Sequence, residues 1–170
     1  MQETEAINSA REHTYSTLLT WTGNKGQGTS AYDAYGRDYE VACAGKTTIR
    51  GSADSSYLGD TERHNPEEML VSALSACHML WYLHLCAVKG VVVTAYEDTA
   101  EGQMQTHADG SGEFKQVTLR PRATISADSD PDEARRLHKE ANAMCFIARS
   151  VNFPVHHRPE IQTGQQSGLS

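Results

Sequence analysis

Long uncharged hydrophobic runs, basic clusters and paired cysteine motifs are scarce in this chain of 170 residues. No stretch approaches the roughly 18 uncharged apolar residues of a membrane-spanning helix, so we expect no membrane segment. Lysine and arginine total 15 against 22 acidic residues, and they form no run. A net charge of −7 would repel a phosphate backbone, so we expect no nucleic-acid partner.

The four cysteines form no Cys-x-x-Cys pair, and the opening Met-Gln-Glu-Thr-Glu lacks the basic and apolar regions of a signal peptide. We therefore expect the reducing cytoplasm, where scattered cysteines are more often buried or catalytic than joined in disulfides. Hydrophobic residues make up 38% of the chain and charged residues 22%, which favours a soluble globular protein. We expect one domain over 13–162, a flexible arm at 1–12 and a disordered tail at 163–170.

The first part of the chain has the pattern of a β meander. Residues 13–22 alternate with β-branched and aromatic side chains, which predicts a strand with one buried face. The glycines of 23–28 predict a turn. Residues 32–41 and 42–50 then predict two further strands.

A helix start follows at Asn65-Pro66-Glu67-Glu68. Asparagine stands at the N-cap, proline at the first helical position, and glutamate three residues after the cap. From Met69 to the stop at Gly90 the sequence is apolar nearly all round, with Lys89 as its one charged residue. Such a helix must be covered on most sides, so we expect it to lie against a sheet and a second subunit.

The rest of the chain mixes strands with a second helix. Residues 91–101 and 114–126 predict two paired strands joined through a glycine-rich turn. Residues 131–150 predict an amphipathic helix, and 151–161, with two prolines, predict a short edge strand. The fold class is therefore α+β, with antiparallel sheets flanking a buried central helix.

Two cysteines lie in the predicted helices, Cys77 in the apolar one and Cys145 near the end of the amphipathic one. If the helices pack together, the two thiols would meet within disulfide range; otherwise both are small core hydrophobes. A reactive thiol must be a thiolate, which needs a cation beside it. Arg37, in a segment otherwise poor in basic residues, is the candidate, and the alternative is an ordinary surface arginine.

Histidines offer no convincing metal site. His78, His84 and Cys86 share one helix, but their spacing does not place two ligands on one metal, and the chain has no His-Glu-x-x-His. We expect core or interface histidines, a surface pair at 156–157, and no metal or other cofactor.

Residues 65–70 (NPEEML) followed by 73–77 (ALSAC) resemble a characteristic segment of the OsmC/Ohr family, the osmotically inducible and organic hydroperoxide resistance proteins. The segment around Arg37 resembles the arginine segment of this family, and Cys145 resembles its second cysteine. Family members often have proline after that cysteine, whereas this chain has Phe146. The chain is therefore most similar to a divergent OsmC-like subgroup.

The resemblance implies an intertwined homodimer and a thiol peroxidase for organic hydroperoxides that needs no metal. Cys77 would attack the peroxide, Cys145 would resolve the product as a disulfide, and a dithiol such as a lipoyl group would reduce it. Arg37 would hold Cys77 as a thiolate, and Glu67 would fix Arg37 by an ion pair.

Three apolar neighbours of Cys77 suit a hydrophobic peroxide, although ordinary helix packing explains them equally well; they are Leu74, Leu80 and Trp81. Cys43 and Cys86 have no counterpart in the family pattern, so we expect buried spectators. A non-catalytic, stress-associated dimer is the alternative function. It would bind a hydrophobic small molecule or sense redox state, and the missing Cys-Pro favours it.

The position of Glu67 predicts a site shared between subunits. Ten residues of straight helix place Glu67 about 15 Å from Cys77 along the axis and about 80° around it. One arginine does not easily bridge that distance within a single helix. Two copies packed antiparallel about a two-fold axis would bring the start of one helix beside the middle of the other.

Overall fold

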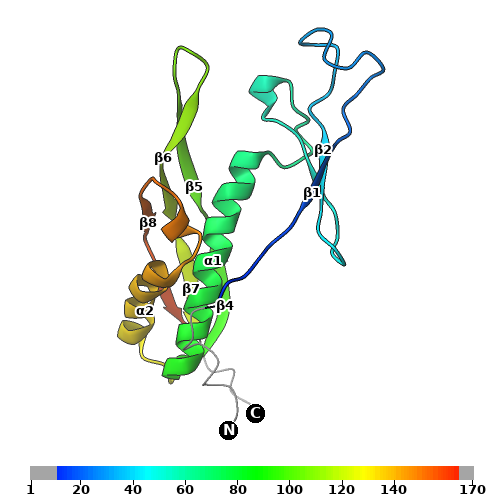
Figure 1. Ribbon diagram of the computed structural model, residues 1–170. Coiled ribbons are helices and arrows are strands. Elements are labelled where there is room, and N and C mark those ends of the chain that lie inside the picture. The colour runs from blue at the N-terminus through cyan, green and yellow to red at the C-terminus, as the bar shows by residue number, and fades with distance from the viewer. Residues whose placement is uncertain (1–10, 165–170) are drawn as a thin grey trace. The chain divides into compact units, whose positions relative to one another are not determined.

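A computed structural model describes residues 11–164 of the protein (Figure 1). The chain forms two compact units, Met1–Pro66 and Glu67–Ser170. Most of the predicted arm and tail, residues 1–10 and 165–170, lies outside the described residues.

The first unit contains the predicted meander with shorter strands. Strands β1 (Leu18–Trp21), β2 (Tyr39–Ala42) and β3 (Ile49–Gly51) form an antiparallel sheet in that order, followed by the 3₁₀ turn η1 (Ser55–Tyr57). All four side chains of β1 are exposed, so the predicted buried face is absent from this strand. The predicted turn at 23–28 is part of a longer loop between β1 and β2. Within it the Asn24 side chain accepts backbone hydrogen bonds from Gly26 and Gly28, both at positive φ.

The long helix α1 (Pro66–Lys89) begins and ends where the sequence predicts. Two glutamates in its first turn and Lys89 in its last turn complement the helix dipole. Gly90 ends it at a φ of 75°, a conformation that glycine adopts without strain. One face of α1 is buried, and it consists of Leu74, His78, Tyr82, Leu85 and Cys86.

By length and composition α1 is apolar enough to cross a membrane, in contrast to the sequence expectation. Soluble proteins also contain such helices in their cores. The fully buried His78 faces another histidine of the same unit, which is the environment of a core helix.

The second unit contains two three-stranded sheets. The first has the order β4-β7-β9, made of Val93–Asp98, Pro121–Ile125 and Glu160–Thr163; the second has the order β5-β6-β8, made of Glu101–Thr106, Gly112–Leu119 and Val155–His157. The two predicted strands do pair, through β4 and β7. The second one, 114–126, is divided between β6 and β7, and β6 pairs with the additional strand β5. The predicted edge strand is also two strands, β8 and β9, and both pair in parallel.

Helix α2 (Pro131–Met144) ends earlier than predicted. Its start is as expected, since the Asp130 side chain accepts a hydrogen bond from the backbone of Asp132 at 2.9 Å. The backbone of Cys145 is extended, with ψ of 113°, so the helix stops there and the 3₁₀ turn η2 (Ala148–Ser150) follows. Cys145 is therefore the C-cap of α2 and not a residue within it.

The core of the second unit lies where the helices meet the sheets. One apolar cluster joins α1, α2, β7 and Val91, which lies two residues after α1; it includes Tyr82, Leu85, Cys86, Val91, Ala123, Ile125, Ala134, Leu137 and Ala141. A smaller cluster joins Leu74 of α1 to Val117 and Leu119 of β6. Asp98 fixes α1 on the sheets, because it accepts hydrogen bonds from the Ser75 hydroxyl at 2.5 Å and the Arg120 backbone at 2.7 Å.

Candidate thiol site

The second unit brings Cys77 and Cys145 together. Cys77 is half-buried on α1, and Cys145 is buried at the end of α2. The thiols of Cys145 and Cys77 are close enough to interact, and both cysteines are free. Of the two alternatives that the sequence left open, the structure has the one in which the thiols lie near each other, with Cys145 at the C-cap of α2.

The surroundings of Cys145 favour its protonated form. Burial, followed by the interaction with the Cys77 thiol, raises the pKa of the Cys145 thiol to about 11. The backbone N–H groups of Ala148 and Ile147 oppose this rise, and that of Ala148 lies 3.4 Å from the sulfur. Cys145 therefore keeps its proton near neutral pH.

An aromatic pair from the same two segments lies beside these thiols in sequence. Trp81 is one helical turn after Cys77, and Phe146 directly follows Cys145. Their rings meet edge to face with centroids 5.5 Å apart, and Phe146 is 64% exposed. The aromatic residue that replaces the expected proline thus adds an apolar surface that the sequence analysis did not assign.

The other two predicted apolar neighbours point to different surroundings. Leu74 is fully buried against Val117 and Leu119, where it is part of the core. Leu80 is 62% exposed. The structure does not gather Leu74, Leu80 and Trp81 into one surface, and their contact with substrate stays a prediction.

Arg37 belongs to the first unit, where backbone and aromatic groups hold its side chain. Its guanidinium donates to the carbonyls of Tyr35 at 2.7 Å and Tyr32 at 2.6 Å. It also lies 4.2 Å and 4.5 Å from the centroids of the same two rings. These contacts hold the Arg37 side chain in place within the first unit.

Glu67 lies in the first turn of α1, as expected. It belongs to the second unit and Arg37 to the first. The ion pair between them, and the effect of Arg37 on Cys77, stay predictions.

Next to Cys77 along α1, His78 forms a buried pair that the sequence did not reveal. Its Nε2 lies 3.0 Å from Nδ1 of His138 on α2, so one ring donates to the other, and both side chains are fully buried. Burial lowers the pKa of His78 to about 4 and that of His138 to about 3, so both are neutral at pH 7. His157 is half-buried with its ring 5.7 Å from that of His78, so the predicted surface pair is wrong for His157.

Four polar atoms around this histidine pair have no hydrogen-bond partner among the described residues: His78 Nδ1, His138 Nε2, and the hydroxyls of Tyr82 and Tyr96. The Tyr82 ring stacks on His138 with centroids 3.7 Å apart. The sequence contained one signal that His138 is buried: it falls on the apolar stripe of α2, between Leu137 and Ala141.

The remaining cysteines have unlike surroundings. Cys86 is buried, as expected, and burial raises the pKa of its thiol. Cys43 is half-buried, so the expectation of a buried residue is wrong there. Within residues 11–164, histidines, cysteines and carboxylates form no group of three that would hold a metal ion.

Comparison with known proteins agrees with this fold. A family model described as OsmC-like protein matches residues 59–160. The chain therefore belongs to the OsmC-like protein family, which confirms the resemblance noted in the sequence. The uncharacterised protein YmaD of Bacillus subtilis is 22% identical over 147 residues, covering 85% of this chain and 90% of its own.

Solved structures show the same α+β architecture. An OsmC-like protein of unknown function from Vibrio cholerae has a TM-score of 0.79 and 29% identity, covering 87% of this chain and 99% of its own. The organic hydroperoxide resistance protein OhrB of Bacillus subtilis has a TM-score of 0.58 and 18% identity, covering 87% of this chain and 98% of its own. The family thus includes proteins named for hydroperoxide resistance and proteins without a known function.

Proposed function

We propose that the protein is a thiol-dependent peroxidase that reduces organic hydroperoxides through Cys77 and Cys145. The contact between these two thiols, from the middle of α1 and the end of α2, carries the proposal. A thiol that is oxidised beside a second thiol forms a disulfide, which a dithiol then reduces. Membership of a family that includes organic hydroperoxide resistance proteins supports the same chemistry.

The proposed reaction has three balanced steps. The Cys77 thiolate attacks the terminal peroxide oxygen, the O–O bond breaks, and the alkoxide takes up a proton and leaves as an alcohol. Cys77 is then a sulfenic acid, which condenses with the Cys145 thiol to form a disulfide and water. A dithiol reductant, a lipoyl group in our proposal, finally restores both thiols and is itself oxidised to a disulfide.

In this scheme the two cysteines have different roles because their surroundings differ. Cys145 keeps its proton, so it is a protonated thiol when it meets a sulfenic acid at Cys77. The same proton combines with the hydroxide that leaves the sulfenic acid. The roles proposed for Arg37 and Glu67 are to add a cation beside Cys77 and to orient that cation.

An apolar substrate fits the residues beside the thiols. The exposed ring of Phe146 and its edge-to-face partner Trp81 offer a surface for the organic group of a hydroperoxide, which hydrogen peroxide lacks. We also propose a homodimer, because α1 exposes Leu80 and Val88 at 62% and 60% in the single chain.

Steady-state peroxide reduction tests the proposed function. With dihydrolipoamide as reductant, we expect dithiol-dependent consumption of cumene hydroperoxide at a rate about tenfold or more above that of hydrogen peroxide. Cys77→Ala removes the nucleophile and abolishes the reaction, whereas the matched variant Cys86→Ala keeps it.

Activity that persists in Cys77→Ala, or no consumption above the reductant alone, would contradict the proposal. Binding of an apolar ligand without peroxide consumption would instead favour a non-catalytic dimer.

A further inference from the structure

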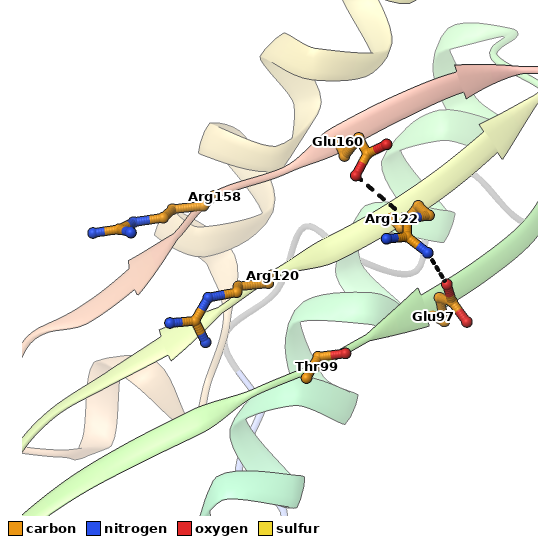
Figure 2. A pocket seen from close by; sticks show the side chains of 6 residues that line it. All are labelled: Glu97, Thr99, Arg120, Arg122, Arg158 and Glu160. Atoms are coloured by element: carbon orange, nitrogen blue, oxygen red, sulfur yellow. Dashed lines mark hydrogen bonds and ion pairs between the residues drawn. The ribbon is translucent and has the colours of Figure 1, made fainter.

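A concave surface lies on the exposed face of the sheet β4-β7-β9. Its cavity has a volume of about 240 Å³ and is lined by Glu97, Thr99, Arg120, Arg122, Arg158 and Glu160 (Figure 2). Along β7 the side chains alternate between core and solvent, and Arg122 is on the solvent side. This arginine cavity belongs entirely to the second unit and does not include Cys77 or Cys145.

Strand register arranges the lining in two rows. In the first row Glu97 of β4 lies opposite Arg122 of β7, which lies opposite Glu160 of β9. Leu119 pairs with His157 and Arg122 pairs with Glu160, and the two pairs have the same separation in sequence. Arg120 and Arg158 lie between these pairs with the same separation, so they lie opposite each other. By the same count along β4 and β7, Thr99 lies opposite Arg120 on its other side.

The first row is electrostatically complete. Arg122 donates to Glu97 at 2.7 Å and to Glu160 at 3.3 Å, and both contacts are ion pairs. The arrangement of one cation between two carboxylates leaves this row with no unmatched positive charge.

The second row has the opposite character. Arg120 has one ion pair outside the row, with Glu101 at 3.3 Å. Among the described residues no carboxylate forms an ion pair with the Arg158 side chain, which is exposed. Figure 2 shows that the side chains of Arg120 and Arg158 extend from neighbouring strands in the same direction, away from the ion pairs of Arg122.

Like charges directly opposite each other on a sheet are destabilising, so a bound anion would stabilise a row with two adjacent arginines. Guanidinium groups bind the oxygens of phosphate and carboxylate groups in a forked geometry. A hydroxyl such as that of Thr99 is a further donor at the edge of the same row.

We propose that the arginine cavity binds the phosphate or carboxylate group of a small molecule between Arg120 and Arg158, with Thr99 as an additional hydrogen-bond donor. Binding neutralises the unmatched charge of Arg158 and leaves the ion pairs of Arg122 in place. The site is separate from the proposed peroxidase reaction, and each proposal is tested without the other.

Titration with simple anions, followed by the NMR shifts of assigned backbone amides, tests this site. Inorganic phosphate and acetate are added in separate series at constant ionic strength, which holds screening of exposed charges fixed. We expect saturable binding with a dissociation constant of about 10 mM or tighter and shifts centred on Thr99, Arg120 and Arg158. The anion that binds more tightly identifies the group as a phosphate or a carboxylate.

Two exposed arginines provide a matched pair of variants. Arg158→Gln removes the charge but keeps a polar side chain that can donate a hydrogen bond, and we expect it to weaken binding about tenfold or more. Arg135→Gln removes a charge from α2, where Arg135 pairs with Asp132, and leaves binding unchanged. No saturation with either anion, shifts centred elsewhere, or equal losses in the two variants would overturn the proposal.

Discussion

One helix, α1, carries two cysteines in unlike surroundings. Cys77 is half-buried and its neighbour is the thiol of Cys145, whereas Cys86 is 1% exposed in the apolar core. Burial raises the pKa of the Cys86 thiol. The difference teaches that the position of a cysteine on an apolar helix does not decide its chemistry. Access to solvent and a second thiol distinguish Cys77 from Cys86.

The buried histidine pair resembles Cys86 and not Cys77, because it lies in the core. His78 and His138 are neutral in a core with few polar partners, and the Tyr82 ring covers His138. We therefore assign them to stability and not to the thiol chemistry, although His78 directly follows Cys77.

The largest expected effect is the loss of stability in acid. Because the folded-state pKa values of His78 and His138 lie below the ordinary value, the unfolded chain binds more protons below pH 6.5. The free energy of unfolding therefore falls as the pH falls from about 6.5 towards 4. The expected loss is up to about 1.4 kcal/mol per pH unit for each histidine that stays neutral when folded.

Urea unfolding at pH 7 and pH 5 measures this loss. His138→Phe keeps a ring on Tyr82 and reduces the slope of stability against pH, whereas His107→Gln, at an exposed turn, does not change it. An unchanged slope in His138→Phe would remove the histidine pair from the account.

The next effect concerns the two thiols of α1 directly. At neutral pH we expect iodoacetamide to alkylate Cys77 about a hundredfold faster than Cys86, because the Cys86 thiol is buried and its pKa is raised. Peptide mapping after brief treatment reads the two rates in one sample. First labelling at Cys86 or Cys43 would make the assignment of Cys77 wrong.

Removing the partner thiol sharpens the comparison further. Cys145→Ser still consumes the first equivalent of peroxide, but the product stops at a sulfenic acid that dimedone traps. Turnover with a dithiol falls about tenfold or more, because no internal thiol resolves the product. Cys86→Ala serves as the control and forms no dimedone adduct. Unchanged turnover in Cys145→Ser would exclude Cys145 from the mechanism.

The smallest expected effect is a partial recovery of peroxidase activity when an inactive variant and a weakened variant are mixed. Dimers of Cys77→Ser are mixed with dimers of Glu67→Gln until subunits exchange, which mass spectrometry verifies. If Glu67 acts across the proposed homodimer, each mixed dimer contains one complete site, about half of the normal number. Activity that stays at the Glu67→Gln level after exchange would mean that Glu67 does not act across subunits.

Local signals in the sequence predicted much of the fold. The cap, proline and glutamate at 65–68 place the start of α1, and Gly90 places its end, because these signals act within one turn of helix. The end of α2 was missed because residues 145–150 have helical spacing but no strong stop residue. The extended backbone of Cys145 depends on packing that spacing does not encode.

The candidate site was predictable only in part. The pairing of Cys77 with Cys145 followed from the two helices and the family pattern, whereas the contact of His78 with His138 depends on how α1 and α2 cross. Phe146 and the arginine rows were missed for a similar reason. Ring contacts and strand register join residues that are distant in the sequence.

The number of thiols lost per peroxide tests the central claim most directly. The chain has four cysteines, and their thiols are titrated before and after one equivalent of cumene hydroperoxide, without a reductant. The account predicts the loss of two thiols per chain and a single linked peptide that joins Cys77 to Cys145, with Cys43 and Cys86 still free. The loss of no thiols, or a disulfide that includes Cys86, would contradict it.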